Sequence, residues 1–386
     1  MICEKEVFMS DFSRAKVAVN LSDIAGNVKA IRKMIRPGTK IMAVLKADAY
    51  GLGMLRAAQA VLGAGADWIG VATVDEGITL RRAGVFVPIL VFAPVFEQEY
   101  ESAILEDLTT TFFAIAPCQK LSQVALRLGK TAKVHIKLDT GMARIGYTLE
   151  DMDKAAGEIL AITKLPALKV GGIYSHLATS DSDPAFVARQ LASFLRMTNK
   201  LEGMGARIPL KHISNSGGVL NHPECNLDMV RCGIMVYGMA PCSSRQGVAR
   251  LEQMGFKQAF TFKSRVSQVK TVRKGESVGY SRAYFAKKDI TVASVPVGYA
   301  DGLSRQLSNK GKVLINGQYC DIIGNVCMDQ FMADATGAGA QVGDEVVIIG
   351  SSGGERLLAE DVAGWQSSIN YEVATALSLR VPKRYV

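Results

Sequence analysis

Short apolar segments alternate with helix-like stretches along the first ~240 residues of the chain. Eight of these segments are rich in β-branched and aromatic residues: 40–46, 68–73, 88–93, 109–114, 133–139, 170–176, 210–216 and 229–237. Such nearly continuous apolar strands are typical of a parallel sheet covered by helices. Between the first two segments, Leu52, Leu55 and Leu62 recur at helical spacing. Eight strands alternating with helices predict an α/β fold, a (β/α)8 TIM-like barrel, which we assign to residues 1–241.

The pattern then changes, and residues 242–386 are predicted to form a second, mostly β domain. A chain of 386 residues is longer than one core usually organises. Strands are predicted at 266–272, 290–297, 312–315, 319–323 and 345–349, with a hairpin turn at Asn316–Gly317 and at least one helix within 357–379. A further strand at about 14–20 has no place in the barrel, so we expect it to pair with the second domain. Residues 1–12 and 243–247 are expected to be weakly ordered.

Composition excludes several classes of partner. Hydrophobic residues make up 48% and charged residues 21%, and no apolar run reaches the ~18–20 residues of a membrane helix. Forty-five basic and 36 acidic residues give a net charge of +9, but the basic residues are scattered, so we expect no nucleic-acid partner. The seven cysteines contain no CxxC pair, which favours reduced thiols and no metal site. A cytoplasmic enzyme is the expectation.

Chemically useful residues stand where several predicted barrel strands end, which is where barrel active sites lie. These residues are Lys46 after the first strand, Lys137, Asp139 and Arg144 after the fifth, His176 after the sixth, Asn215 and Ser216 after the seventh, and Arg231 and Gly233 in the eighth. A lysine that ends an apolar run resists protonation and is able to form a Schiff base. The glycine-rich segments after the last two strands are typical of phosphate loops. Together they indicate pyridoxal phosphate, although a barrel aldolase or a sugar-phosphate enzyme would use similar parts.

Eight motifs, in order, resemble those of the alanine racemase family. They are VLKADAYGLG (44–53), KLDTGMARIG (137–146), YSHLATSD (174–181), ISNSGG (213–218), VRCGIMVYG (230–238), VGYADG (297–302), GNVCMDQ (324–330) and INYEV (369–373). The resemblance extends from about Val17 to the C-terminus. It implies a pyridoxal-phosphate-dependent racemase of L- and D-alanine that supplies D-alanine for cell walls. In the family this enzyme is a homodimer whose sites combine one subunit's barrel with its partner's β domain.

The resemblance assigns two bases, because racemisation removes a proton from one face and returns one to the other. Lys46 would carry the cofactor and serve as one base, and Tyr280 would serve as the other. A free tyrosine has a pKa of about 10, so a tyrosine base needs nearby cations. Tyr284 is close in sequence, but the spacing to Tyr299 favours Tyr280.

The remaining roles are also implied by the resemblance. Arg231 would face the pyridine nitrogen, with His176 between it and the tyrosine base. Arg144 would contact the cofactor's phenolic oxygen and the substrate carboxylate, and Lys137 matches a position that is carbamylated in many relatives. The cofactor-binding set also includes Tyr50, Asn215, Ser216, Gly233, Ile234 and Tyr371, and the substrate-binding set includes Tyr299, Met328 and Asp329.

Three alternatives are open at this point. The same chemistry would serve serine or several small amino acids. A barrel-type amino-acid decarboxylase shares the two-domain layout, but Arg231 argues against the strong electron sink that decarboxylation needs. A pyridoxal-phosphate carrier would need neither Tyr280 nor the second domain. The chain departs from the family at Leu52, where histidine is usual, and we expect only a local effect.

Overall fold

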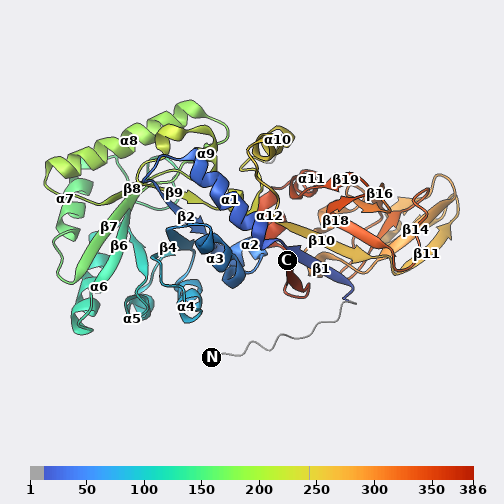
Figure 1. The fold of residues 1–386 in the computed structure, drawn as a ribbon, viewed down its shortest axis with the longest axis horizontal. Coiled ribbons are helices and arrows are strands. Elements are labelled where there is room, and N and C mark those ends of the chain that lie inside the picture. The colour runs from blue at the N-terminus through green and yellow to red at the C-terminus, as the bar shows by residue number, and fades with distance from the viewer. Residues whose placement is uncertain (1–12, 243) are drawn as a thin grey trace.

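The computed structural model describes residues 13–242 and 244–386, which form an α/β barrel followed by a mostly β region (Figure 1). Residues 1–12 and 243 lie outside the described residues. The expectation that they are weakly ordered therefore stays a prediction. The barrel and the second sheet stand side by side, and helices α1, α2, α3 and α12 lie where the two meet (Figure 1). No helix in the described residues combines the length and apolar character that a membrane crossing needs.

The barrel contains eight parallel strands in the order β8-β7-β6-β5-β4-β3-β2-β9. Their bounds are β2 Lys40–Val44, β3 Trp68–Val71, β4 Ile89–Pro94, β5 Thr109–Phe112, β6 Ala132–Lys137, β7 Leu168–Tyr174, β8 Leu210–His212 and β9 Met229–Cys232. Backbone hydrogen bonds from Asp228 N to Lys211 O and from Arg231 N to Ser214 O, 3.0 and 3.1 Å long, join the two end strands. The barrel is therefore nearly closed.

Helices follow most of the barrel strands, and several of them begin at a residue whose side chain caps the helix. They are α1 Leu21–Met34, α2 Lys46–Gly51, α3 Met54–Gly63, α4 Val74–Arg82, α5 Tyr100–Leu105, α6 Ile115–Arg127, α7 Met152–Ile162, α8 Pro184–Gly203, α9 Ser216–Asn221 and α10 Arg245–Gln253. Thr73 and Glu76 form a capping box at the start of α4. Asp183 caps α8, whose first residue is Pro184. Ser244 caps α10, so the structure has the start of a helix where weak order was expected for 244–247.

Polar groups occupy the inside of the barrel beside an apolar cluster. Met42, Leu90, Tyr174 and Met229 form that cluster. His135 and Lys137 lie two residues apart on β6, which places both on one face of the strand. His135, Lys137 and Arg231 are each 3% exposed or less. Buried polar groups need partners, so these three side chains mark the barrel interior as a candidate site.

The second sheet has the order β11-β14-β17-β16-β15-β18-β10-β1-β20, with β19 paired to β18. The strands are β1 Ala15–Val19, β10 Phe260–Arg265, β11 Gln268–Val272, β14 Ile290–Val295, β15 Lys312–Ile315, β16 Gln318–Ile323, β17 Phe331–Asp334, β18 Glu345–Ser352, β19 Glu355–Leu357 and β20 Lys383–Tyr385, and a separate ribbon pairs β12 Ser277–Val278 with β13 Tyr284–Phe285. Strand β1 runs antiparallel to β10 and parallel to β20. Both ends of the described chain therefore lie in the second sheet.

Two helices, α11 Ala359–Trp365 and α12 Asn370–Thr375, occupy the segment where at least one was expected. Helix α12 brings the end of the chain back to the barrel, where it contacts α2. Gly51 lies so close to the Ala374 carbonyl that an added Cβ on Gly51 would be 2.5 Å from the carbonyl oxygen. The six cysteines in the described part of the chain are all free, and Cys118, Cys225, Cys232 and Cys320 are buried.

Candidate active site

Lys46 follows strand β2 at the carboxyl end of the barrel and opens an unusual turn. The next four residues, Ala47, Asp48, Ala49 and Tyr50, all have left-handed backbone angles, with φ between 52° and 58°. A left-handed conformation costs about 1–2 kcal/mol for each residue other than glycine. Surrounding bonds hold the turn: Ala47 N donates to Glu76 Oε1 at 2.7 Å, and Met54 N donates to Asp48 Oδ1 at 2.7 Å. Strain held in this way is typical of functional sites.

The Lys46 amine is partly buried in a cationic environment. Burial lowers the pKa of Lys46 below its ordinary value, the charge of Arg144 lowers it further, and Glu76 opposes the change. A larger neutral fraction makes the amine a better nucleophile. Lys46 is therefore suited to covalent attachment of a carbonyl compound.

Arg231 is a buried cation, 3% exposed, with no acidic partner among the described residues. Its Nη1 donates to His212 Nδ1 at 3.0 Å, and its Nη2 donates to Ser175 O at 2.7 Å, Ile213 O at 3.1 Å and His176 Nδ1 at 3.2 Å. Burial lowers the pKa of Arg231 to about 10, so the guanidinium is still charged at neutral pH.

The hydrogen bonds of Arg231 fix the tautomers of a chain of histidines. An arginine only donates, so His212 Nδ1 accepts and His212 carries its proton on Nε2. That proton is donated to His135 Nδ1 at 3.0 Å, and His135 Nε2 has no partner in the described structure. Burial, followed by the charge of Arg231, lowers the pKa of His135 to about 3 and that of His212 well below its ordinary value. The neutral histidines thus bind the Arg231 guanidinium but leave its positive charge uncompensated.

Lys137 lies beside Arg231 inside the barrel. Burial lowers the pKa of Lys137 to about 7, with further lowering by Arg231 and Arg144 against the opposite effect of Asp139. Its Nζ donates to Leu138 O at 2.8 Å and stands over the Tyr174 ring. Arg144 is on the exposed loop after β6. Asp139 shapes this loop by accepting from the backbone N–H groups of residues 141–143 at 2.9–3.1 Å.

The loops after β8 and β9 form a cradle beside the Lys46 turn. Ser216 Oγ accepts from Gly233 N at 3.1 Å, and an added Cβ on Gly233 would lie 2.1 Å from Tyr50 Oη. Any larger residue at position 233 would displace the Tyr50 side chain. The Tyr50 ring lies 6.0 Å from that of Tyr371 on α12. Burial is the main cause that raises the pKa of both phenols, so they stay protonated and able to donate.

Two further predicted residues belong to the same group. Ile234 follows Gly233 and is 1% exposed. Asn215 caps α9 by accepting from Gly218 N at 2.9 Å, and its Nδ2 lies 3.5 Å from His176 Nε2. The burial of His176 and the charge of Arg231 lower its pKa well below the ordinary value. Every predicted residue from the barrel, together with Tyr371, therefore lies in one neighbourhood.

The remaining predicted residues lie in turns and loops of the second, mostly β region and form a separate exposed group. Tyr280 is 72% exposed, Met328 53% and Tyr299 43%. Asp329 bonds to Arg380, with 2.7 Å between its Oδ1 and Arg380 Nη2. Among the described residues, no hydrogen bond, ion pair or ring contact joins this group to Lys46 or to the barrel cradle. Within one chain, the two groups are thus not directly bonded to each other.

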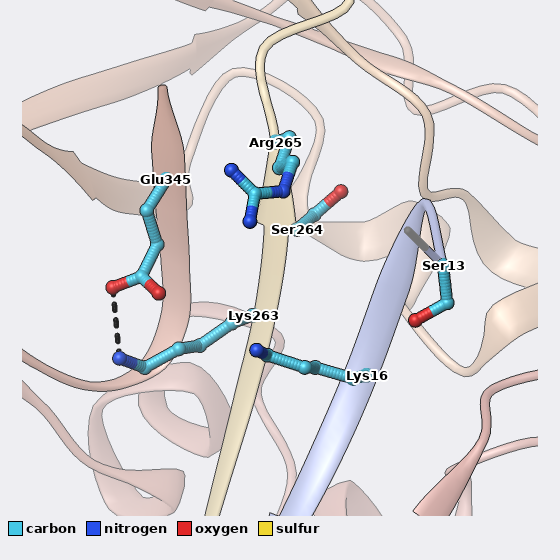
Figure 2. Close-up of a pocket in the computed structure, with 6 residues that line it drawn as sticks. All are labelled: Ser13, Lys16, Lys263, Ser264, Arg265 and Glu345. Carbon is cyan, nitrogen blue, oxygen red and sulfur yellow. Dashed lines mark hydrogen bonds and ion pairs between the residues drawn. The ribbon is translucent and has the colours of Figure 1, made fainter. Parts of the chain in front are cut away.

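Two cavities lie elsewhere and contain none of these residues. One, of about 10 Å³, lies between β1 and β10 beside Lys16 and Lys263, and is large enough for roughly one water molecule (Figure 2). Lys263 pairs there with Glu345 at 2.8 Å. The other, of about 550 Å³, is lined by segments that include Phe256 and Arg356. The residues of the candidate site thus lie outside both cavities.

Sequence reasoning missed several residues that shape the site. Glu76, on α4, accepts from Ala47 N and from Ala72 N, both at 2.7 Å, and ties the Lys46 turn to β3. His135 and His212 stood inside two predicted strands, where a histidine is usually structural. Gln190 is fully buried and joins Thr140 Oγ1 to the His176 carbonyl, at 3.1 and 3.0 Å. Only the alternation of β6, which pairs His135 with Lys137, offered a sequence signal.

Comparison with known proteins agrees with this geometry. The family model for the N-terminal domain of alanine racemase matches residues 19–241, and that for the C-terminal domain matches residues 259–385. Alanine racemase 2 of Caldanaerobacter subterraneus subsp. tengcongensis is 40% identical over 373 residues, 96% of this chain and 94% of that protein. The alanine racemase of Methanococcus maripaludis is 38% identical over 95% of this chain and 97% of its own length.

Solved structures extend the likeness to three dimensions. Alanine racemase from D-cycloserine-producing Streptomyces lavendulae superposes with a TM-score of 0.92 at 33% identity, covering 97% of each chain. The enzyme from Bartonella henselae, crystallised with covalently bound pyridoxal phosphate, gives 0.86 at 27% identity over 97% of this chain and 100% of that one. The chain belongs to the alanine racemase family.

Proposed function

We propose that this chain interconverts L- and D-alanine with pyridoxal phosphate bound at Lys46. Arg231 is the observation that carries the proposal, because a buried cation without an acidic partner stands at the same end of the barrel as a lysine of lowered pKa. When bound, pyridoxal phosphate supplies the electron-withdrawing system that makes an amino acid's α-proton removable. Arg231 only donates hydrogen bonds, so it would leave the ring nitrogen unprotonated and disfavour decarboxylation and transamination.

The barrel residues fit this cofactor. Lys46 would bind it covalently, and the close approach of Tyr50 to Gly233 supports a phosphate held by Tyr50, Ser216, Gly233, Ile234 and Tyr371. Arg144 would contact the phenolic oxygen and the substrate carboxylate, a bidentate role suited to arginine. Asn215 and His176 would support these contacts from behind. We place the division between the two domains at 241/242.

The second base has to come from a partner subunit. Lys46 would take or return a proton on one face of the substrate, and Tyr280 of a second copy would act on the opposite face. The exposure of Tyr280, Tyr299 and Met328 on one chain supports an apolar contact surface of this kind. We infer an obligate homodimer in the cytoplasm with two composite sites.

Lys137 is proposed to be carbamylated by carbon dioxide. Its pKa of about 7 leaves much of the amine neutral, and Arg231 and Arg144 are close enough to influence it. Addition of the neutral amine to carbon dioxide forms an N–C bond and releases one proton. The product is an anion that would pair with Arg144 and orient it toward the substrate.

Alanine is the favoured substrate over serine and other small amino acids. Tyr299 and Tyr371 would narrow the entrance and fit a methyl side chain. Leu52, where the family usually has histidine, is 0% exposed and packs in the core, which supports a purely local effect of this departure.

Hydrogen exchange at the α-carbon tests the proposal directly. Purified protein with cofactor is incubated with L-alanine in D₂O while optical rotation and deuterium incorporation are followed. Wild type is expected to racemise with exchange, Lys46→Ala to be inactive, and Tyr280→Phe to lose about 10²–10⁴ in rate. L-Serine in the same assay measures specificity. A protein that binds the cofactor but neither exchanges nor racemises alanine would contradict the proposal.

A further inference from the structure

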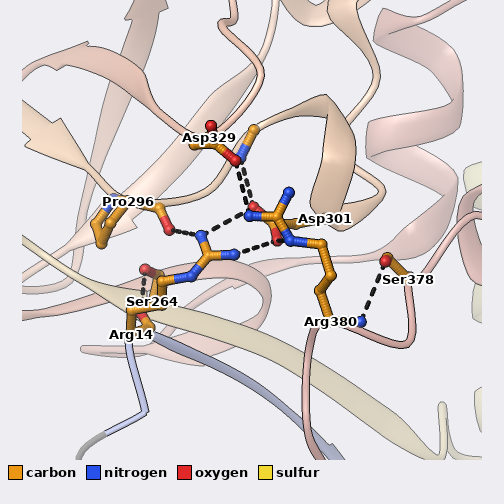
Figure 3. A network of polar contacts seen from close by, with 8 residues as sticks. Arg14, Ser264, Pro296, Asp301, Asp329, Ser378 and Arg380 are labelled. Carbon is orange, nitrogen blue, oxygen red and sulfur yellow. Dashed lines mark hydrogen bonds and ion pairs between the residues drawn. The ribbon is translucent and has the colours of Figure 1, made fainter.

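A buried carboxylate in a turn of the mostly β region connects the residues that we place near the substrate (Figure 3). Asp301 is 0% exposed. It accepts from Arg14 through both oxygens, at 2.5 Å from Nη2 to Oδ1 and 3.0 Å from Nη1 to Oδ2. Gly298 N donates to Oδ2 at 3.0 Å, and Arg380 Nε lies 3.5 Å from Oδ1. Two arginines and a backbone N–H thus compensate a fully buried charge, as such a charge requires.

The same anchor holds Tyr299 against the loop of Met328. Tyr299 N donates to Cys327 O at 3.1 Å, and Ala300 N donates to Met328 O at 3.0 Å. An added Cβ on Gly298 would lie 2.3 Å from both of these carbonyl oxygens, so only glycine permits the approach. The turn Tyr299–Asp301 and the loop of Met328 therefore form one rigid unit.

Arg380 bridges this buried anchor to the exposed Asp329. Its Nη2 donates to Asp329 Oδ1 at 2.7 Å, while its Nε faces Asp301. The Asp329 side chain is 53% exposed, and its carboxylate has no other partner in the described part of the chain. An exposed carboxylate with one charged partner takes its orientation from that partner. Arg380 also balances a negative charge that would otherwise repel an anionic substrate.

We propose that Arg380 is a positioning residue for substrate recognition. Anchored by Asp301, it fixes the orientation and the charge balance of Asp329 and so tunes the affinity of the site for short amino-acid carboxylates. The inference rests on the proposed function, since Asp329 meets substrate only in a composite site. Loss of Arg380 removes binding of ground state and transition state alike, which raises KM and leaves kcat nearly unchanged.

Arg380→Met is compared with wild-type holoenzyme and with Arg356→Met. Arg356 is the matched control, because it pairs with Glu252 on the surface away from Asp329. We expect the KM for L-alanine to rise about tenfold in Arg380→Met, with kcat within about threefold of wild type. Calorimetric binding of propionate, which lacks the reacting amine, should weaken by the same factor. Arg356→Met should match wild type in both measurements.

A double-mutant cycle separates positioning from a general structural role. If Arg380 acts through Asp329, Arg380→Met changes KM little in an Asp329→Asn background. Arg380→Lys keeps the positive charge but cannot contact Asp301 and Asp329 at once. Its affinity for L-alanine should therefore lie between those of Arg380→Met and wild type. Unchanged KM in Arg380→Met, or equal changes in both backgrounds, overturns the inference. If Arg380→Met does not fold, a wild-type KM in Arg380→Lys overturns it. Failure of the proposed function differs from these, because wild type itself would then not racemise alanine.

Discussion

At the scale of single residues, the site depends on charges that are buried without opposite charges. Arg231 is surrounded by two neutral histidines and two carbonyl groups, and Lys137 lies close to it. Burial lowers the pKa of Lys137. The charge of Arg231 lowers this pKa further, because a second positive charge is less stable beside a cation. The cluster is suited to receive anions: a phosphate, a carboxylate or a carbamate.

The Lys137 pKa of about 7 predicts how its carbamylation depends on pH. Carbon dioxide reacts only with the neutral amine, whose fraction rises from roughly one tenth at pH 6 to roughly nine tenths at pH 8. In ¹³C-bicarbonate, a carbamate resonance should therefore grow over this range. It should vanish in Lys137→Ala and persist in Lys133→Ala, which removes an exposed lysine of the same strand. A resonance that survives in Lys137→Ala would assign the modification elsewhere.

At the scale of elements, alternation of apolar strands and helices was enough to predict the barrel, whereas local conformation was not predictable. Strands β10 and β17 were absent from the predicted strands. Strand β10 (FTFKSR) carries lysine and arginine on its exposed side, and β17 is only four residues long, so neither shows a continuous apolar run. The left-handed turn after Lys46 consists of residues whose propensities do not indicate it. Bonds to Glu76 on α4 and packing against α12 impose it. Propensity is local, but these constraints come from distant segments.

The left-handed turn predicts opposite effects of glycine at two exposed alanines. Ala47 has a φ of 54°, where glycine is unstrained, so Ala47→Gly should raise the free energy of unfolding by up to about 1 kcal/mol. Ala47→Val should lower it by about 1 kcal/mol or more, since a β-branched side chain is strained there. Ala192 is exposed within the right-handed helix α8, and Ala192→Gly should cost about 0.5–1 kcal/mol. Urea unfolding measures all three; equal losses in both glycine variants would mean that the turn is not strained.

At the scale of the whole molecule, the family resemblance predicted the site residues and their division between two subunits, and the structure of one chain shows which of these residues lie near one another. The barrel residues and Tyr371 meet because α12 returns to the Lys46 turn. Tyr280, Tyr299, Met328 and Asp329 lie in turns and loops of the mostly β region, and the ribbon that flanks Tyr280 packs against β14 through Val278 and Tyr284. Distances between segments of different subunits are not encoded in strand or helix periodicity. That two subunits share each site therefore stays a prediction of the family resemblance.

Complementation between two inactive variants tests the composite site. If each site combines Lys46 of one subunit with Tyr280 of the other, a hybrid of Lys46→Ala and Tyr280→Phe subunits has one doubly altered site and one intact site. Random co-assembly at equal amounts makes half of the dimers hybrids, so activity should recover to about a quarter of wild type. Each variant alone serves as the control, and sedimentation velocity verifies the dimer. If both residues of a site came from the same chain, every hybrid site would carry one lesion and mixing would restore nothing.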